Sequence, residues 1–589
     1  MSVHNADIAA IFDEIADLLE IRSDNPFRIR AYRNAARSIG GFGQEFEARV
    51  RSGAKLPKLP GIGADLEAKI HEIVATGHCA VLDKLRKQIS PAIVELLKIP
   101  GLGPRRVQAL HRQLGVTTVA QLKQAAAAGQ IRRLAGFGIR TEQRILEALA
   151  AHAEQAQRFR HSVATPYAEA LAAYLKRVRG VKQVVIAGSY RRMKDTVGDL
   201  DILVTARSGS PVIERFIAYD EIREVLAHGA TRSSIVLRNG LQVDLRLVPA
   251  ESYGAALHYF TGSKAHGIAV RRLAQARGLK LNEYGVFRGE RRVAGLTEES
   301  VFASVGLPFI EPELREDRGE IEAARAGCLP QLVTPADLRG DLHVHSKTSD
   351  GHNTIREMAL AAKAQGMRYI AITDHSRRLT VAHGLDPQRL ARQGDEIDRL
   401  NSELSGITVL KGVKVDILED GTLDLPDSTL ERLDVVIAAV HSKFGLPRRK
   451  QTERILRALD NRCVNLLAHP SGRLIGEREP MDIDMLRVMR KAKSRHVFLE
   501  LNAQPARLDL DDVMCQMARD EGVPVSINSD AHSTFDFANL RHGIGQARRG
   551  WLERGDVLNT RNLKALRALL KLKRNPRSGI LPEEDDSNG

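Results

Sequence analysis

The sequence predicts a multidomain protein with an α-helical N-terminal region, a central α/β region and a C-terminal series of βα units. Three observations indicate this order. A short glycine-containing phrase recurs among amphipathic helical patterns in the first 150 residues, and the periodicity becomes extended from Val181. After Thr334, seven apolar runs recur, spaced by about 30 residues, the length of one βα unit. At 589 residues we expect about two to five domains.

Composition and charge narrow the class of protein. Hydrophobic residues make up 43% of the chain, and no uninterrupted apolar stretch approaches the length that spans a bilayer. The first residues lack the pattern of an export leader, so we expect a cytoplasmic protein with no membrane partner. Lys and Arg outnumber Asp and Glu by 88 to 73, which favours polyanionic partners such as DNA or RNA. The four cysteines lie far apart, so we expect reduced core thiols rather than disulfides or a thiolate zinc site.

One glycine-containing phrase occurs three times in the helical region, at residues 59–63, 99–103 and 134–138. Its two glycines allow backbone N–H groups and the following helix N-terminus to face one anion. A single copy would more simply end a helix, but the repetition favours binding of DNA phosphates. The phrases resemble helix-hairpin-helix motifs, which hold DNA through its backbone. The DNA-binding residues implied are Gly61, Gly63, Gly101, Gly103, Gly136 and Gly138.

The opening helices carry a candidate nucleophile. The segment 27–36 (FRIRAYRNAA) and the first glycine phrase, followed by Lys69, resemble the small lyase domain of family X DNA polymerases. In that family a lysine of this helix forms a Schiff base with an abasic sugar, and Lys69 matches it. A neighbouring lysine that binds the 5′-phosphate in animal relatives is Asp65 here. A helical surface lysine is more often only solvated, and this alternative for Lys69 stays open.

Extended patterns in the central region carry three carboxylates. An apolar run leads into Gly188 and Ser189, and Asp199 and Asp201 then alternate with apolar residues. Alternate residues of a strand point to one face, about 7 Å apart. Asp244 lies among apolar residues in a further strand pattern. Such carboxylates repel one another unless cations bind them, and two Mg²⁺ ions roughly 4 Å apart are what phosphoryl transfer requires.

The Gly-Ser turn changes the interpretation of the aspartates, because an isolated Asp-x-Asp would suit a solvated surface strand. Together they resemble the nucleotidyltransferase palm of family X polymerases. The resemblance implies that Asp199, Asp201 and Asp244 bind Mg²⁺ and catalyse the transfer, with Asp244 accepting the primer proton.

The phrase at 259–266 (YFTGSKAH), followed by Arg271, resembles the thumb of the same family. There the Tyr-Phe pair crowds the 2′ position of the sugar, and the arginine contacts the template side. Gly267 stands where the family has an asparagine that touches the incoming nucleotide, so we expect weaker nucleotide affinity or fidelity. The nucleotide-binding residues implied are Gly188, Ser189, Arg192, Gly198, Tyr259, Phe260, Gly262 and Arg271.

Most of the apolar runs after Thr334 end in a potential metal ligand, and barrel enzymes carry their chemistry at those strand ends. One histidine there is more often structural, but a set of histidines and acids is hard to explain in that way. Imidazole and carboxylate ligands suit Mn²⁺, Zn²⁺ or Fe²⁺, which activate water for phosphoester hydrolysis. The candidates are His343, His345, Asp350, His375, His441, His469, Asp530 and His532.

This pattern resembles the PHP phosphoesterase family, whose fold is a distorted (β/α)7 barrel that holds three metals. PHP domains joined to bacterial family X polymerases include 3′→5′ exonucleases, abasic-site endonucleases and 3′-phosphatases. Lys414 stands where the family has a glutamate that bridges two metals, and a lysine ammonium is repelled by such cations. Either the site holds fewer metals, with Asp416 or Glu419 compensating, or the barrel is an inactive scaffold.

The resemblances cover nearly the whole chain and imply a bacterial family X DNA polymerase. We expect templated addition of dNTPs in short gaps during base excision repair, on gapped or primer-template DNA, by a monomer with Mg²⁺ in the polymerase site and Mn²⁺ or Zn²⁺ in the barrel. The alternatives are a structural repair factor and a PHP phosphoesterase with an impaired polymerase site. The expected domains are lyase-like helical (1–90), helix-hairpin-helix fingers (91–155), nucleotidyltransferase palm (156–252), thumb (253–318), linker (319–335), PHP barrel (336–575) and disordered tail (576–589).

Overall fold

The structure is a computed structural model of the chain. It describes residues 5–40, 62–90, 102–152 and 158–572, with the single positions 3, 46, 50, 56, 93, 96, 97 and 99. Gly61, Gly101 and the predicted tail 576–589 therefore lie outside the described residues. The chain divides into two compact units: one consists of Met1–Phe159, Ile217–Leu226 and Ile235–Gln242, the other of Arg160–Phe216, Ala227–Ser234 and Val243–Gly589.

The N-terminal region is helical, as its amphipathic patterns predict. Apolar side chains of the first helix, including Ile8, Phe12 and Ile15, are fully buried. Phe12 meets Tyr32 edge to face, with ring centroids 5.6 Å apart. Gly63, Gly103 and Gly138 each stand directly before a helix. The helices are α1 (Asn5–Ile21), α2 (Pro26–Gly40), α4 (Ala64–Thr76), α5 (Ala80–Gln88), α7 (Pro104–Leu114), α8 (Val119–Ala127) and α9 (Ile139–His152).

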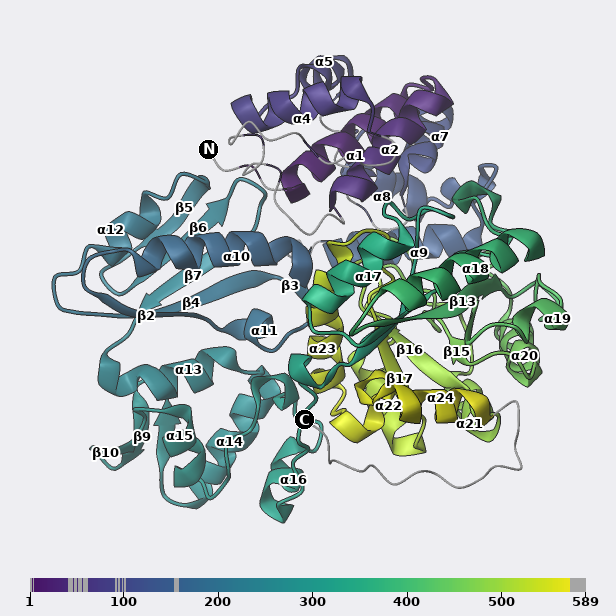
Figure 1. Ribbon diagram of the computed structural model, residues 1–589. Coiled ribbons are helices and arrows are strands. Elements are labelled where there is room, and N and C mark those ends of the chain that lie inside the picture. Colours follow the sequence, from purple (N-terminus) through teal and green to yellow (C-terminus); the bar gives the residue numbers. More distant parts are fainter. Residues whose placement is uncertain are drawn as a thin grey trace. The chain divides into compact units, whose positions relative to one another are not determined.

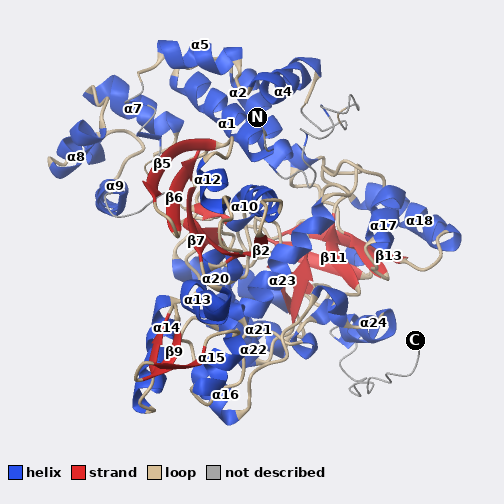
Figure 2. Ribbon diagram, turned by 90° about the vertical axis from the view of Figure 1, so that its left-hand side faces the viewer, coloured by secondary structure: helices blue, strands red, loops and turns tan. Residues whose placement is uncertain are grey.

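A five-stranded sheet with the order β2-β4-β7-β6-β5 follows, and Figure 2 shows its curved strands in red. β2 and β4 are antiparallel, with Val184 opposite Val204. Leu200 and Ile202 are fully buried, so the aspartates that alternate with them point to the other face. The elements are β1 (Phe159–Arg160), α10 (His161–Lys176), β2 (Val181–Ile186), α11 (Gly188–Arg191), β3 (Thr196–Val197), β4 (Asp199–Ala206), α12 (Val212–Ile217), β5 (Ile222–His228), β6 (Arg232–Leu237) and β7 (Gln242–Leu247).

The next region combines helices with a small antiparallel sheet. Its core includes Val270, Val286 and Phe302. The segment 319–335, expected as a linker, contains helix α16 and contributes Ile321 and Leu332 to this core. The elements are α13 (Tyr253–Thr261), α14 (Lys264–Ala276), β8 (Lys280–Asn282), β9 (Gly285–Arg288), β10 (Arg291–Ala294), α15 (Glu298–Ser304) and α16 (Glu320–Ala326).

The C-terminal region is a seven-stranded parallel sheet whose strands follow one another in sequence order, β11 to β17. Helices surround the strands (Figure 1). A parallel bridge between Val344 and Ala531 joins the ends of the first and last strands, so the sheet nearly closes into the predicted barrel. The strands are β11 (Gly340–Val344), β12 (Tyr369–Ile372), β13 (Thr408–Asp416), β14 (Val435–Ala439), β15 (Leu466–Leu467), β16 (Phe498–Asn502) and β17 (Val525–Asn528). The helices are α17 (Ile355–Ala364), α18 (Pro387–Glu403), α19 (Asp427–Leu430), α20 (Arg448–Asp460), α21 (Met485–Ser494), α22 (Asp512–Glu521), α23 (Leu540–Arg549) and α24 (Leu563–Leu572).

Within the described ranges, no helix has both the length and the apolar character needed to cross a bilayer. All four cysteines are free thiols, and Cys79, Cys463 and Cys515 are buried. The expectation of a core thiol is wrong for Cys328, which is exposed, because it follows the glycine that ends α16.

Candidate functional site

The predicted carboxylates come together on neighbouring strands. Asp199 and Asp201 lie on β4, Asp244 lies on the adjacent β7, and Gly198 joins β3 to β4. Burial, and then the charges of Asp199 and Asp244, raise the pKa of Asp201 to about 7. Oxygen donors whose negative charges oppose one another are the donor set that Mg²⁺ prefers. The ligand atoms of these three residues do not all lie within 4.8 Å of one another, as those of the barrel groups do, but their chemistry fits the predicted metal.

Gly188 lies directly against the carboxylates. Its φ is +64°, and a Cβ at this position would be 2.7 Å from Asp201 Oδ2, so any side chain would be both strained and in collision. Ala187 N–H donates to the Asp201 carbonyl over 2.7 Å. The Gly-Ser turn, with Ser189 in α11, is therefore fixed beside Asp201, as the motif predicts.

Arg192 and Gly262 also meet at one place. The Arg192 guanidinium donates from Nη1 to the Thr261 carbonyl, and a Cβ at Gly262 would lie 3.3 Å from that nitrogen. Arg192 Nε donates to Glu316 Oε1 over 2.9 Å. The predicted triphosphate-binding arginine is thus oriented by a carboxylate that the motif analysis did not find.

The same Glu316 oxygen accepts a hydrogen bond from a second arginine, which belongs to the barrel. Arg549 of α23 donates from Nη1 to Glu316 Oε1 over 2.9 Å and to the Arg192 carbonyl over 2.8 Å. Burial raises the pKa of Glu316, but the charges of Arg192 and Arg549 outweigh it, and the pKa is lowered. These partners are 233 positions apart in the chain, and no local sequence pattern reveals such a pair.

The Tyr-Phe pair of the predicted thumb lies at the end of α13. The Tyr259 and Phe260 ring centroids are 5.0 Å apart, and Tyr259 keeps 42% of its surface exposed. Arg271 Nε donates to the Gly267 carbonyl over 3.1 Å, and its guanidinium lies 6.0 Å from the Tyr259 ring. A Cβ at Gly267 would meet nothing within 4 Å, so the position has room for a side chain.

In the helical unit, the described glycines of the repeated phrase have open surroundings. A Cβ at Gly63, Gly103, Gly136 or Gly138 would meet nothing within 4 Å, so internal packing does not demand glycine there. An open backbone before a helix suits a partner that approaches closely, such as a phosphate. Lys69 of α4 is ion-paired with Asp65, with Nζ 2.5 Å from Oδ1.

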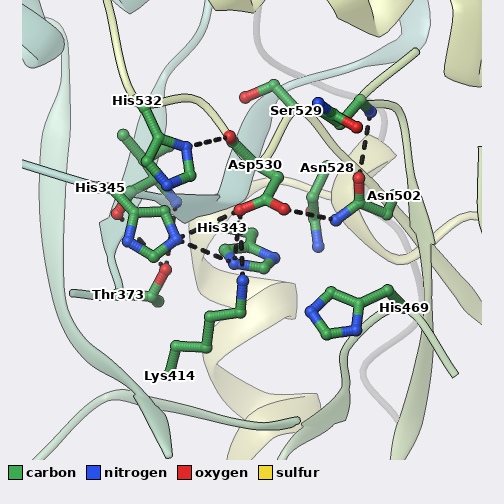
Figure 3. A network of polar contacts seen from close by, with 12 residues as sticks. His343, His345, Thr373, Lys414, His469, Asn502, Asn528, Ser529, Asp530 and His532 are labelled. Carbon is green, nitrogen blue, oxygen red and sulfur yellow. Dashed lines mark hydrogen bonds and ion pairs between the residues drawn. The ribbon is translucent and has the colours of Figure 1, made fainter. Parts of the chain in front are cut away.

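The predicted ligands of the barrel gather at the C-terminal ends of its strands. They form two groups whose ligand atoms lie within 4.8 Å of one another: His345, Asp350, His375 and His532 in one, and His343, His345 and Asp530 in the other. His345 joins both, because its Nδ1 faces Asp350 and its Nε2 faces Asp530. Figure 3 shows His343, His345 and Lys414 converging on Asp530.

His345 and His532, which both belong to the first group, differ in their electrostatics. Burial, followed by the charge of His532, lowers the pKa of His345 to about 3, which leaves a neutral ring able to bind a metal. Burial lowers the pKa of His532, but its hydrogen bond and charge interaction with Asp350 outweigh burial and raise it to about 9. Buried ring nitrogens of His345, His375, His441 and His469 have no hydrogen-bond partner among the described residues. Such orphaned nitrogens fit a site for metal ions.

The remaining predicted barrel residues lie beside these groups. The His441 and His469 rings are 5.5 Å apart, and Asp416 Oδ1 is 3.3 Å from His441 Nδ1. Glu419 does not compensate for Lys414, because its side chain is 58% exposed and pairs with Lys443.

Motif reasoning missed Glu500, which is fully buried on β16 and lies 2.5 Å from His343 Nδ1. A carboxylate at this position orients the ring that would bind a metal. The signal was an acid inside the apolar run 497–501, VFLEL.

The fold and these sites define a class of protein: a nucleotidyltransferase joined to a barrel that carries candidate metal ligands. Comparison with protein families agrees. Residues 160–251 match the DNA polymerase beta palm, and residues 256–316 match its thumb. Residues 341–504 match the PHP domain. Residues 3–79 match a helix-hairpin-helix domain, and 93–151 match a SAM-like helix-hairpin-helix tandem.

The chain belongs to the bacterial family X DNA polymerases that carry a C-terminal PHP domain. It is 39% identical to DNA polymerase/3′-5′ exonuclease PolX of Bacillus subtilis over 97% of this chain and 100% of that protein. It is 27% identical to DNA polymerase lambda of Arabidopsis thaliana over 53% of this chain and 62% of that protein. Over 33% of this chain and 80% of the relative, it is 34% identical to a probable phosphatase of Acetivibrio thermocellus. The predicted family and fold class are confirmed.

Proposed function

We propose that the chain fills short gaps in DNA by templated addition of dNTPs. The observation that carries this proposal is the carboxylate cluster of Asp199, Asp201 and Asp244 against the Gly188 turn. These residues would hold Mg²⁺, which activates the primer 3′-OH and neutralises the departing pyrophosphate. Asp244 is the candidate acceptor of the primer proton.

The other residues of this site bind and select the nucleotide. Arg192 offers a guanidinium to the triphosphate, as its fork of donors suits phosphate oxygens. The Tyr259 and Phe260 rings occupy space that the 2′-OH of a ribonucleotide would need. We further propose that the enzyme acts in base excision repair, as a monomer, and in the cytoplasm, where a bacterium keeps its DNA.

The barrel supports a second activity, hydrolysis of 3′ ends. Its two ligand groups offer imidazole and carboxylate donors, which suit Mn²⁺ or Zn²⁺. A bound ion would supply an activated water for attack on the phosphoester. Trimming a damaged 3′ end would prepare it for extension.

For the helical unit, we propose binding of the DNA backbone by the glycine phrases. Lys69 is the candidate nucleophile for an abasic sugar. Its ion pair with Asp65 must open before the amine can attack. The Asp65 side chain is 81% exposed and that of Lys69 is 12% exposed, so water screens the pair only in part. Borohydride trapping on abasic DNA, with Lys69→Ala as control, tests this role.

The polymerase proposal is tested with a labelled primer in a one-nucleotide gap, with Mg²⁺ or Mn²⁺. Templated extension by the wild type supports it. Binding of the gap without extension would instead favour a structural repair factor. Shortening that needs Mn²⁺ and survives loss of extension would make the barrel the main enzyme.

Replacing Glu316 by alanine is expected to weaken nucleotide binding. Without Glu316, Arg192 and Arg549 lose their common acceptor and repel each other, so Arg192 is held only by its hydrogen bond to the Thr261 carbonyl. We expect KM for dNTP to rise about tenfold, the effect of losing one oriented charged hydrogen bond, with kcat changing less. Steady-state gap filling at varied dNTP concentration measures both.

Glu313→Ala is the matched control. Glu313 pairs over 2.7 Å with Arg548, which lies next to Arg549 on α23. The Glu313 side chain is 12% exposed, against 13% for Glu316. It has no bond to Arg192. An equal rise of KM in both variants would show that Glu316 acts only through stability.

Introducing asparagine at Gly267 is expected to strengthen nucleotide binding. The position is open and lies one turn before Arg271, so an amide could reach the nucleotide without a steric clash. We expect KM for dNTP to fall by about three- to tenfold, the value of one hydrogen bond. Gly267→Ala is the control, because it alters the helix backbone without adding an amide. Equal KM values for the asparagine and alanine variants would contradict the prediction.

A further inference from the structure

Lys414 places a positive charge inside the histidine cluster of the barrel. It belongs to β13, where Val413 and Val415 pack into the core outside the strands. Alternate residues of a strand point to opposite faces, so Lys414 points inward. Lys414 is 2% exposed, and its Nζ lies 3.4 Å from Asp530 Oδ1.

The carboxylate oxygen that Lys414 contacts is already the meeting point of one ligand group. His343 Nε2 lies 3.0 Å and His345 Nε2 lies 3.2 Å from Asp530 Oδ1. A divalent ion bound to this oxygen would be about 2.1 Å from it, within about 5.5 Å of Nζ by the sum of the two distances. Like charges this close in a buried site repel strongly, and the ammonium brings no lone pair. Figure 3 shows the Lys414 ammonium directed at this group.

The second ligand group keeps all four of its donors. Asp350 Oδ2 lies 3.4 Å from both His375 Nε2 and His532 Nε2, and Asp350 Oδ1 lies 3.4 Å from His345 Nδ1. One carboxylate and three imidazoles complete a tetrahedral set for Zn²⁺ or most of the sphere of Mn²⁺. Lys414 pairs with Asp530 and not with Asp350, the acid of this group, although its charge also acts on His345, His375 and His532.

A third position near His441 and His469 lacks an acid between the rings. Among the described residues, neither histidine falls in a group of three potential ligands. Asp416 contacts His441 from the Nδ1 side, but it also lies 3.3 Å from Arg378. Two imidazoles alone make a weak site.

We propose that Lys414 is a fixed cation that takes the place of metal ions beside Asp530, so that the barrel holds one tightly bound divalent ion, at His345, Asp350, His375 and His532. The inference rests on the proposed role of the barrel as a metal site. It makes Lys414 the residue that sets the metal content of this chain.

The test counts metal ions rather than activity. Full-length protein carrying Asp199→Asn and Asp201→Asn, which remove two of the three polymerase-site carboxylates, is stripped with chelator, loaded with Mn²⁺ and desalted. Its metal content is then measured by plasma mass spectrometry, and its affinity by titration calorimetry. We expect one ion per chain in this background and at least two after Lys414→Glu. Lys411→Glu is the matched control on the same strand, because Lys411 pairs outside the cluster with Asp398, and its count should stay at one.

Two or more tightly bound ions with Lys414 intact would overturn the inference, and so would none. If Lys414→Glu fails to fold, Lys414→Met removes the charge and keeps the length of the stem. We expect it to bind a second ion at least tenfold more tightly than the parent, and an unchanged titration would count against the proposal. A barrel that binds one ion but does not hydrolyse 3′ ends would refute the proposed hydrolase and support the one-ion inference. A barrel that binds two ions and hydrolyses 3′ ends would support the hydrolase and refute the inference.

Discussion

An Asp201→Asn variant is expected to lose templated incorporation by roughly 10³-fold or more, because a metal-bound carboxylate contributes several kcal/mol to phosphoryl transfer. Asp201 interacts electrostatically with both Asp199 and Asp244, and their negative charges help to raise its pKa. Asparagine keeps the shape and removes the charge that the cations need. Single-turnover extension of a one-nucleotide gap with Mg²⁺ measures the loss.

Asp195→Asn is the control for this experiment. Asp195 follows the same Gly-Ser turn, but it pairs with Arg473 over 3.2 Å and is not among the clustered carboxylates. Its variant should extend primers at close to the wild-type rate. Comparable activity of the Asp201 variant would place the chemistry elsewhere.

The same substitution should stabilise the metal-free protein at high pH. The pKa of Asp201 is raised from 3.8 to about 7 in the fold, so its contribution to the free energy of unfolding falls between about pH 4 and pH 7 and stays low above that range. The amide of the substituted asparagine cannot ionise, so the unfavourable free energy of ionising a buried carboxyl is absent from the variant. In chelator at pH 8, Tm should therefore rise by at least about 2–4 °C, whereas at pH 4 the two proteins should nearly coincide. A rise of equal size at both pH values would exclude the charge as its cause.

The sequence was informative where a short motif fixes local geometry. The Gly188 turn and the alternation around Asp199 and Asp201 predicted a strand pair with clustered acids, since the strand period and the need for space leave few options. In the barrel, strand-end histidines predicted a convergent site because parallel strands place their ends on one side.

What could not be predicted depends on contacts between distant segments. The Arg192–Glu316–Arg549 arrangement joins three elements that share no pattern in the chain. The double use of His345 follows from ring orientation, which a sequence does not specify. The effect of Lys414 on metal binding likewise could not be predicted without its distance to Asp530. The sequence alone allowed both a barrel with fewer metal ions and an inactive scaffold.

An Asp350→Asn variant is expected to abolish tight metal binding in the barrel and to lower Mn²⁺-dependent shortening of 3′ ends by about 10²–10³-fold, the effect of losing a first ligand to a catalytic ion. Among the described residues, Asp350 is the acid of the ligand group that also contains His345, His375 and His532. Burial raises its pKa, but the hydrogen bond and charge of His532 outweigh burial and hold the pKa well below its usual range. Its negative charge is therefore present at every pH at which the enzyme would work.

Two readouts separate loss of the ion from loss of the fold. In proteins that also carry Asp199→Asn and Asp201→Asn, so that the palm site is disabled, chelator should lower the Tm of the parent, since a ligand at about 100 times its Kd stabilises by about 2.7 kcal/mol, and should leave the Asp350 variant unchanged. Asp416→Asn provides the control, because Asp416 contacts His441 but lies outside both ligand groups. In proteins whose palm carboxylates are intact, templated extension should persist in both variants. If Asp416→Asn removed the ion and Asp350→Asn did not, the ion would lie near His441, and the four-residue site would be wrong.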